Sequence, residues 1–156
     1  MKADEFVALA QLYAEAAALA DAGDWDAWCE LYTDDCSYRL VPRENHERDL
    51  PLATLRFESR GMLKDRAYAI RETLFHDPYY QRHVVGLPRL LGDDGARIRC
   101  EANYAVFRTK PSALTTVFNV GRTLDIVQRT DAGLRFAERL VIYVSELIPN
   151  SIIYPI

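Results

Sequence analysis

The sequence predicts an α+β domain in which a sheet of long strands wraps over N-terminal helices. Two observations lead to this prediction. Apolar residues recur at helical spacing in the first half of the chain, and beyond residue 80 the apolar period changes to two. Turn signals separate the strand-like stretches, and two of the gaps are short enough for antiparallel hairpins. Helices followed by a run of hairpin-linked strands is the element order of an α+β domain.

Two helices are expected at the start of the chain. Apolar residues such as Phe6 and Tyr13 recur at helical spacing across residues 4–22, and Gly23 fits a helix stop. Asp24 then has the side chain of a helix cap. The short second helix carries three large apolar side chains, namely Trp25, Trp28 and Leu31.

The middle of the chain predicts one strand, one irregular segment and a third helix. The sequence TDDCSYRLVP is typical of a turn followed by a strand that ends at Pro42. Residues 43–60 are polar and are expected to be irregular, whereas an apolar stripe predicts a helix over residues 62–75. Four strand-like stretches rich in Val, Ile, Phe, Tyr and Thr follow, at residues 81–91, 96–109, 114–129 and 133–145.

Composition and charge argue against several classes of function. The net charge is −4 and the basic residues are scattered, so neither nucleic acid nor an anionic membrane is an expected partner. No apolar run approaches membrane-spanning length and no signal-peptide pattern opens the chain, which leads us to expect a cytoplasmic protein. The length of 156 residues suits a single domain over 1–156, without internal repeat or linker.

Neither the cysteines nor the histidines have the spacing of a metal site. Cys29, Cys36 and Cys100 are unevenly placed, so we expect three reduced and mostly buried thiols. The sequence contains no Cys-x-His and Cys-x-x-His pair of the kind that holds a Rieske cluster.

A stretch that carries His76, Asp77 and His83 offers two imidazoles and a carboxylate, which is a ligand set for iron. The spacing matches no local ligand pattern, so histidines that are hydrogen-bonded or face solvent are the favoured interpretation.

General acid–base chemistry is an alternative that the residues leave open. The available groups are Asp34, Asp35, Tyr38, His83 and Asp125. A dehydratase or isomerase that used His83 with an aspartate and a tyrosine would need these groups to converge in one cavity. A small-molecule binding module that performs no chemistry is a further possibility. The Asp-Asp pair lies at a predicted turn, where aspartate is common for local reasons.

Three phrases, in this order along the chain, resemble the β subunits of Rieske non-haem iron aromatic-ring-hydroxylating oxygenases. They are YTDDCSYRLVPRENHERDLPL (32–52), ESRGMLKDRAYAIRETLFHDPYYQRHVVGLPRL (58–90) and SELIPNSIIYPI (145–156). The resemblance spans essentially the whole chain. Within the family, HDPYYQRH and IPNSIIYPI look most like the small subunits of salicylate 5-hydroxylase and of anthranilate- and terephthalate-type enzymes.

This resemblance implies a fold, a role and partners. The fold would be the cystatin-like cone shared with nuclear transport factor 2 and scytalone dehydratase, with N-terminal helices packed on a strongly curved, mostly antiparallel sheet. The role would be that of a structural β subunit in an NAD(P)H-dependent oxygenase that inserts O₂-derived oxygen into an aromatic acid such as salicylate. The α subunit would carry the Rieske [2Fe–2S] cluster and the mononuclear Fe(II), three α with three β subunits would assemble, and a ferredoxin or reductase would act indirectly. No catalytic, cofactor-binding or metal-binding residue is implied in this chain.

Three groups of residues are candidates for contact with the large subunit. The first is Arg43, Glu44 and Asn45 in the polar segment, where a guanidinium, a carboxylate and an amide suit hydrogen bonds across a subunit boundary. A loop that only caps its own helix ends is the alternative. The second group is Arg60, Asp65 and Arg66. The third is Ile152, Ile153 and Tyr154 in an apolar tail that must pack either on its own domain or on a partner.

Overall fold

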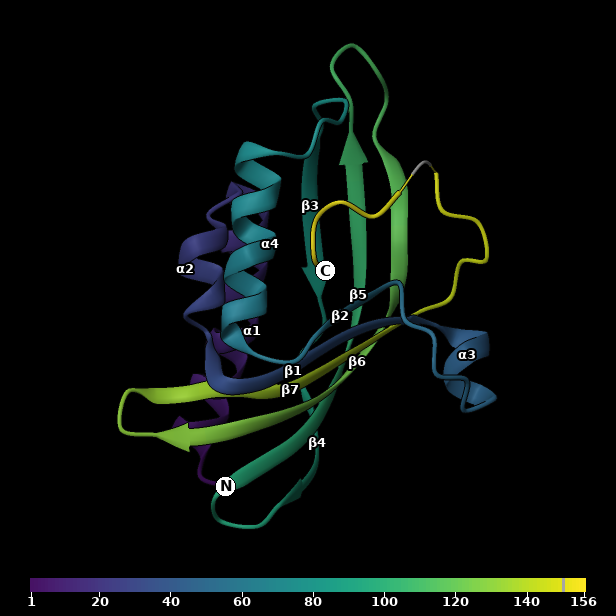
Figure 1. Cartoon of the computed structure of the whole chain (residues 1–156). Coiled ribbons are helices and arrows are strands. Elements are labelled where there is room, and N and C mark those ends of the chain that lie inside the picture. The colour runs from purple at the N-terminus through teal and green to yellow at the C-terminus, as the bar shows by residue number, and fades with distance from the viewer. Residues whose placement is uncertain (150) are drawn as a thin grey trace.

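The computed structural model describes residues 1–149 and 151–156. Its helices are α1 (Ala3–Ala22), α2 (Trp25–Cys29), α3 (Arg43–Glu47) and α4 (Arg60–Glu72). Its strands are β1 (Tyr32–Pro42), β2 (Leu55–Phe57), β3 (Tyr80–Val85), β4 (Arg89–Asp93), β5 (Arg97–Thr109), β6 (Thr116–Thr130) and β7 (Gly133–Tyr143). Figure 1 shows α1, α2 and α4 gathered on one side of the sheet, with α3 apart from them at the far end. None of the helices in these ranges is long and apolar enough to cross a membrane.

The helix ends follow local chemistry. Gly23 ends α1 with a left-handed backbone (φ 72°), a conformation that costs glycine little because it has no Cβ. Asp24 caps α2, since its Oδ1 accepts a hydrogen bond from the backbone N–H of Ala27 at 3.1 Å. Ser59 caps α4 in the same way, by accepting from the N–H of Met62 at 3.2 Å.

Three predictions of local structure were wrong. The turn expected at the start of TDDCSYRLVP lies within β1, whose pairing with β7 is irregular between Tyr32 and Ser37. The segment 43–60 is not irregular throughout, because it contains both α3 and β2. The predicted strand 81–91 is two strands, and its interruption includes Pro88. Proline has no N–H to donate to a strand partner, so a sheet strand rarely runs through it.

The sheet is mixed, in the order β2-β1-β7-β6-β5-β3, with β4 also paired to β5. Pairing is antiparallel except between β1 and β7, which run parallel with Leu40 opposite Val141. Register shifts occur in the β5–β6 and β6–β7 pairs. Such irregularities bend and twist a strand, and Figure 1 shows β5 and β6 bending through the molecule. The structure therefore has the predicted helices on one face of a curved, mostly antiparallel sheet.

The core lies between the sheet and the helices α1, α2 and α4. Side chains from the first helix, the strands and the tail form one hydrophobic cluster. The largest fully buried side chains include Leu9, Tyr32, Tyr38, Leu63, Ile98, Val106, Val127, Phe136 and Val141.

The apolar tail packs on its own domain, which decides between the two alternatives that the sequence left open. Ile152 and Ile156 are 5% and 7% exposed. The Tyr38 hydroxyl donates to the Ile156 carbonyl at 3.0 Å and accepts from the Ile156 N–H at 2.8 Å. Arg66 fixes the preceding residues by donating from Nε to the Ile153 carbonyl at 3.1 Å.

The three cysteines are free and buried, as the sequence predicted. Burial raises the pKa of Cys29 to about 12 and the pKa values of Cys36 and Cys100 to about 11. The folded chain therefore keeps these thiols protonated at pH values at which an unfolded chain would ionise them.

Deletion of residues 151–156 should lower the free energy of unfolding by several kcal/mol, since each fully buried isoleucine contributes roughly 1.5–3 kcal/mol. Urea unfolding followed by circular dichroism measures the change. The matched control is Leu147→Ser, because Leu147 is 83% exposed and should be insensitive. A truncated chain of unchanged stability would contradict the packing described above.

Alkaline pH should destabilise the protein before its tyrosines ionise. Above about pH 8.5 the unfolded state loses thiol protons that the folded state retains, so stability falls as the pH rises toward the folded-state pKa values. Unfolding midpoints in urea at several pH values between about 7.5 and 9.5 test this expectation, because unfolded tyrosines ionise only near pH 10. Cys100→Ala should make the decline less steep, whereas an equally steep decline in that variant would show that the Cys100 thiol does not contribute to it.

Candidate functional site

A row of polar side chains crosses the inner face of the sheet. In register, Cys100 lies opposite Asp125, Asp125 opposite Arg139, and Arg139 opposite Tyr38. Paired residues point to the same face of a sheet. Because Cys100 and Tyr38 are wholly buried, the carboxylate and the guanidinium between them also point into the core.

Asp125 is held by three side chains. The Tyr13 hydroxyl donates a short hydrogen bond to Asp125 Oδ2, and the Thr123 hydroxyl donates to the same oxygen at 2.6 Å. Arg139 Nε lies 3.8 Å from the other oxygen, Oδ1. Burial raises the pKa of Asp125 above its usual range, and the neighbouring Arg139 guanidinium opposes that shift.

The space in front of this pair is filled by aromatic rings. Arg139 Cζ lies over the rings of Phe136 and Tyr13, at 4.6 and 5.5 Å from their centroids. Tyr32 packs on Phe136 and on Trp28 with centroid separations of 5.4 and 4.7 Å. These five side chains are between 0 and 6% exposed. Asp125 and Arg139 also line a hollow of about 220 Å³, but the Asp125 side chain has no exposed surface. The pair is therefore a buried ion pair whose carboxylate is not open to solvent.

The other groups considered for acid–base chemistry lie apart. His83 Nδ1 bonds Asp21 Oδ1 at 2.7 Å, and the same carboxylate accepts from the backbone N–H of His83. Asp34 pairs with Arg60 on the surface, and Tyr38 bonds the tail. The set named from the sequence is therefore not assembled.

The sequence did not predict that Asp21 would bind His83. The sequence indicates a partner for Asp21 only through its position in the last turn of α1. There the negative end of the helix dipole disfavours a carboxylate that has no partner.

The iron ligand set that the sequence offered is also dispersed. His76 Nε2 bonds the Tyr154 hydroxyl at 2.6 Å, whereas Asp77 pairs with Lys110 at 2.8 Å. Across residues 1–149 and 151–156, no three His, Cys, Asp or Glu side chains gather in a way that could hold a metal ion.

The first group of interface candidates lies on α3. Arg43 pairs with Glu47 at 3.2 Å, Glu44 pairs with Arg48 at 2.7 Å, and Asn45 donates to the Leu52 carbonyl at 2.9 Å. Arg43 and Glu44 are exposed and Asn45 is partly exposed. The helix borders a hollow of about 470 Å³ that is also lined by Asn103, Val120, Arg122 and Val144 of the sheet and its end.

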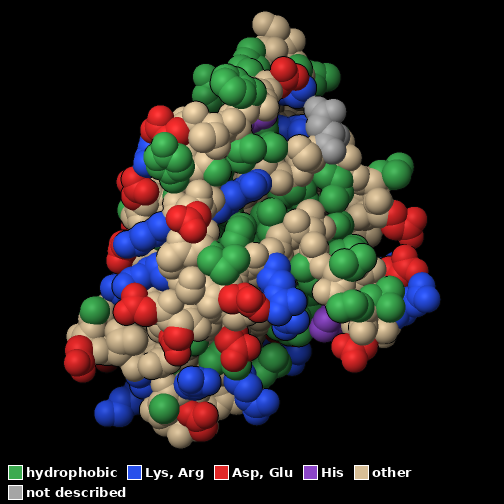
Figure 2. Space-filling view, in the orientation of Figure 1, with side chains coloured by type: hydrophobic (Ala, Val, Ile, Leu, Met, Phe, Trp, Pro, Cys, Tyr) green, Lys and Arg blue, Asp and Glu red, His purple; other side chains and the backbone are tan. Residues whose placement is uncertain are grey.

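The other two groups lie on the helical side. Arg60 joins Glu30 and Asp34, and Asp65 is exposed on the same helix. Arg66 belongs with the third group, because it binds the carbonyls of Ile152 and Ile153. Figure 2 shows blue and red side chains interspersed over the helices on this side of the molecule.

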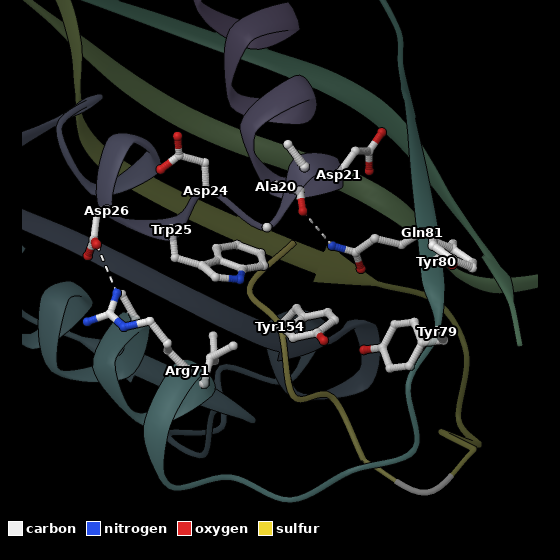
Figure 3. Close-up of a pocket in the computed structure, with 14 residues that line it drawn as sticks. Ala20, Asp21, Asp24, Trp25, Asp26, Arg71, Tyr79, Tyr80, Gln81 and Tyr154 are labelled. Carbon is white, nitrogen blue, oxygen red and sulfur yellow. Dashed lines mark hydrogen bonds and ion pairs between the residues drawn. The ribbon is translucent and has the colours of Figure 1, made fainter.

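A pocket of about 660 Å³ opens where α1, α2, α4, β3 and the tail meet (Figure 3). Three aromatic side chains form one wall. Trp25 stacks on Tyr154 with centroids 5.4 Å apart, and Tyr79 lies 5.0 Å from Tyr154. The charged lining residues are Asp21, Asp24, Asp26 and Arg71. We call this the acidic aromatic pocket. The sequence did not reveal it, since its lining comes from four separate segments of the chain.

Removal of the charge that faces Asp125 tests the structural interpretation of the buried pair. Arg139→Met should lower the free energy of unfolding by about 3–5 kcal/mol, because a buried carboxylate loses its counter-charge. Adding Asp125→Asn should restore much of the loss, since the amide oxygen still accepts from Thr123 while the charge is gone. Urea unfolding of the two variants provides the measurement. A loss below about 1 kcal/mol in the single variant would contradict the pairing.

The chain matches the family model described as "Ring hydroxylating beta subunit" over residues 14–150. It is 30% identical to the anthranilate 1,2-dioxygenase small subunit of Burkholderia cepacia over 131 residues, which is 84% of this chain and 81% of that protein. It is 33% identical over 135 residues to the terephthalate 1,2-dioxygenase terminal oxygenase component subunit beta 1 of Comamonas sp., with 85% and 88% of the two chains covered.

Solved structures agree with these relatives. A protein of Novosphingobium aromaticivorans, proposed to be the β subunit of an aromatic-ring-hydroxylating dioxygenase, superposes with a TM-score of 0.87 at 30% identity over 96% of this chain and 95% of that one. A nuclear transport factor 2-like protein with a cystatin-like fold from the same organism has a TM-score of 0.70 at 22% identity, over 92% and 84% of the chains. The predicted cystatin-like cone is thus confirmed. The chain belongs to the ring-hydroxylating β-subunit family.

Proposed function

We propose that this chain is the structural small subunit of an oxygenase that hydroxylates an aromatic carboxylic acid. Its large subunit would carry the Rieske [2Fe–2S] cluster and the mononuclear Fe(II). The observation that carries the structural role is the burial of Asp125, a carboxylate whose pKa burial raises. Its side chain has no exposed surface and is engaged by Tyr13, Thr123 and Arg139.

The substrate class follows from the relatives. Anthranilate and terephthalate, the compounds in the names of the two curated relatives, are both aromatic carboxylates. An aromatic acid of this kind, salicylate included, is therefore the substrate class that we propose for the assembly. Selection among such acids would take place in the large subunit, where the iron and the substrate pocket lie.

The remaining parts of the proposal concern the assembly. Three large and three small subunits would associate, and electrons from NAD(P)H would reach the large subunit through a reductase or ferredoxin. We place the assembly in the cytoplasm, where the NAD(P)H pool is available. The small subunit would affect turnover by fixing the mutual placement of the large subunits, without contacting a reacting atom.

The exposed α3 is one surface that we propose for contact with the large subunit. Its Arg43 and Glu44 present a guanidinium and a carboxylate beside the hollow on the open face of the sheet. Their ion pairs within α3 are exposed and contribute little by themselves, so a partner can recruit these groups at small cost.

Co-expression with the cognate large subunit tests the proposal. The two chains should co-purify, and hydroxylation of an aromatic acid should require the large subunit. The isolated small subunit should show no turnover over the pH range 5–9. Turnover by the isolated chain that His83→Ala abolishes would instead support the dehydratase or isomerase alternative. Saturable binding of the aromatic acid to the isolated chain without turnover would support a binding module.

A further inference from the structure

The acidic aromatic pocket carries negative potential that the chain itself neutralises only in part. Helix α1 has 20 residues and ends at the pocket, with no basic side chain in its last turn. The carbonyl end of a helix carries partial negative charge. Three aspartates line the pocket. Asp21 is paired with His83 and with Arg82, and Asp26 is paired with Arg71 at 2.8 Å. Among the described residues no basic side chain pairs with Asp24, whose charge adds to this potential.

A buried acceptor points into the same space. Gln81 is only 7% exposed, and its Nε2 donates to the Ala20 carbonyl at 3.0 Å. That bond fixes the carboxamide, and its Oε1 accepts no hydrogen bond from the described residues. Figure 3 shows the oxygen on the side of the pocket where Tyr79 and Tyr154 lie. The Gln81 oxygen can therefore accept a hydrogen bond from a ligand at a defined position in the pocket.

The aspartates retain acceptor capacity as well. Asp24 uses Oδ1 to cap α2, and Asp26 uses Oδ2 to bind Arg71, so each has one carboxylate oxygen that no described side chain engages. A ligand that carries several N–H donors and a positive charge matches these acceptors. The aromatic wall favours the same ligand, since rings attract cations that lie over their faces.

The rim of the pocket indicates that this ligand belongs to a protein. Tyr80 lines the opening and is 75% exposed. Tyrosine side chains are enriched at subunit interfaces, where they contribute much of the binding energy.

We propose that the acidic aromatic pocket receives an arginine side chain of the large subunit. Arginine fits better than lysine because its planar fork of N–H donors can bond the Gln81 oxygen and an aspartate together while stacking on an aromatic ring. The inference rests on the proposed function, since it assumes that a large subunit is present. It goes further by assigning a docking point that involves none of the α3 residues.

The first experiment uses the isolated chain and a small arginine mimic. N-acetyl-arginine methylamide should shift the indole N–H signal of Trp25 in a saturable way, and the shift should weaken with added salt. Trp28 does not line the pocket, and its signal provides the internal comparison. The neutral isostere N-acetyl-citrulline methylamide should have no effect. Equal shifts with both compounds, or with neither, would overturn the assignment of a cationic ligand.

The second experiment measures affinity for the large subunit. The variant D24N/D26N removes two charges from the pocket, and asparagine retains the helix cap at position 24. Affinity should fall about tenfold, mostly at low salt. The matched control D131N/E146Q removes two exposed carboxylates elsewhere and should bind like the unmodified chain. Thermal unfolding of each variant alone shows whether any loss comes from misfolding.

The outcomes separate this inference from the proposed function. If the unmodified chain binds the large subunit and D24N/D26N binds equally well, the docking point is wrong and the proposed function stands. If the mimic binds but affinity for the large subunit is unaffected, the pocket takes a free small cation and the assignment to the large subunit is overturned. If no large subunit binds the unmodified chain, the proposed function fails, and the titration alone still decides whether the pocket recognises a guanidinium.

Discussion

The Arg139 guanidinium is buried in the apolar core. Groups on neighbouring elements offset the free-energy cost of removing it from water. Arg139 extends from β7 toward Asp125 on the neighbouring β6, so the counter-charge is supplied by the adjacent strand. The ring of Tyr13 on α1 covers the guanidinium, and the Tyr13 hydroxyl bonds the same carboxylate. Removal of a charge from water is expensive unless it is paired and surrounded by well-placed groups. Asp125 thereby connects α1, β6 and β7, through its hydrogen bond from Tyr13 and its pairing with Arg139.

The same arrangement explains how a carboxylate with a raised pKa can lie beside a tyrosine without being open to solvent. A raised carboxylate pKa beside a tyrosine is a combination that enzymes use for proton transfer. Here the rings of Tyr32, Phe136 and Trp28 pack against one another, and Phe136 lies under the Arg139 guanidinium. Perturbed ionisation is therefore a result of core packing in this molecule, and the surfaces available for recognition lie on the outside.

Local signals in the sequence were sufficient for part of this structure. Gly23 and Asp24 predicted a helix end and a helix cap, because each acts through its own backbone or its nearest neighbours. Turn residues likewise predicted the boundaries between the antiparallel strands β5, β6 and β7. Interactions between distant segments were not accessible in this way. The pairing of Asp21 with His83, and the orientation of Gln81 by the Ala20 carbonyl, depend on how α1 packs against β3. No periodicity in one segment encodes that contact, which is why the acidic aromatic pocket was missed while the fold class was predicted.

The parallel pairing of β1 with β7 has a consequence for the order in which the chain folds. The hairpins β5–β6 and β6–β7 join neighbours in sequence, so they can form early with little loss of chain entropy. The two strands of the parallel pair are separated by roughly one hundred residues, and their meeting closes a large loop. Until it closes, the edge of β7 is an unpaired strand that exposes hydrogen-bonding groups to other chains. An unpaired β7 edge would therefore favour aggregation during synthesis. The yield of native subunit should depend on how fast β1 pairs with β7.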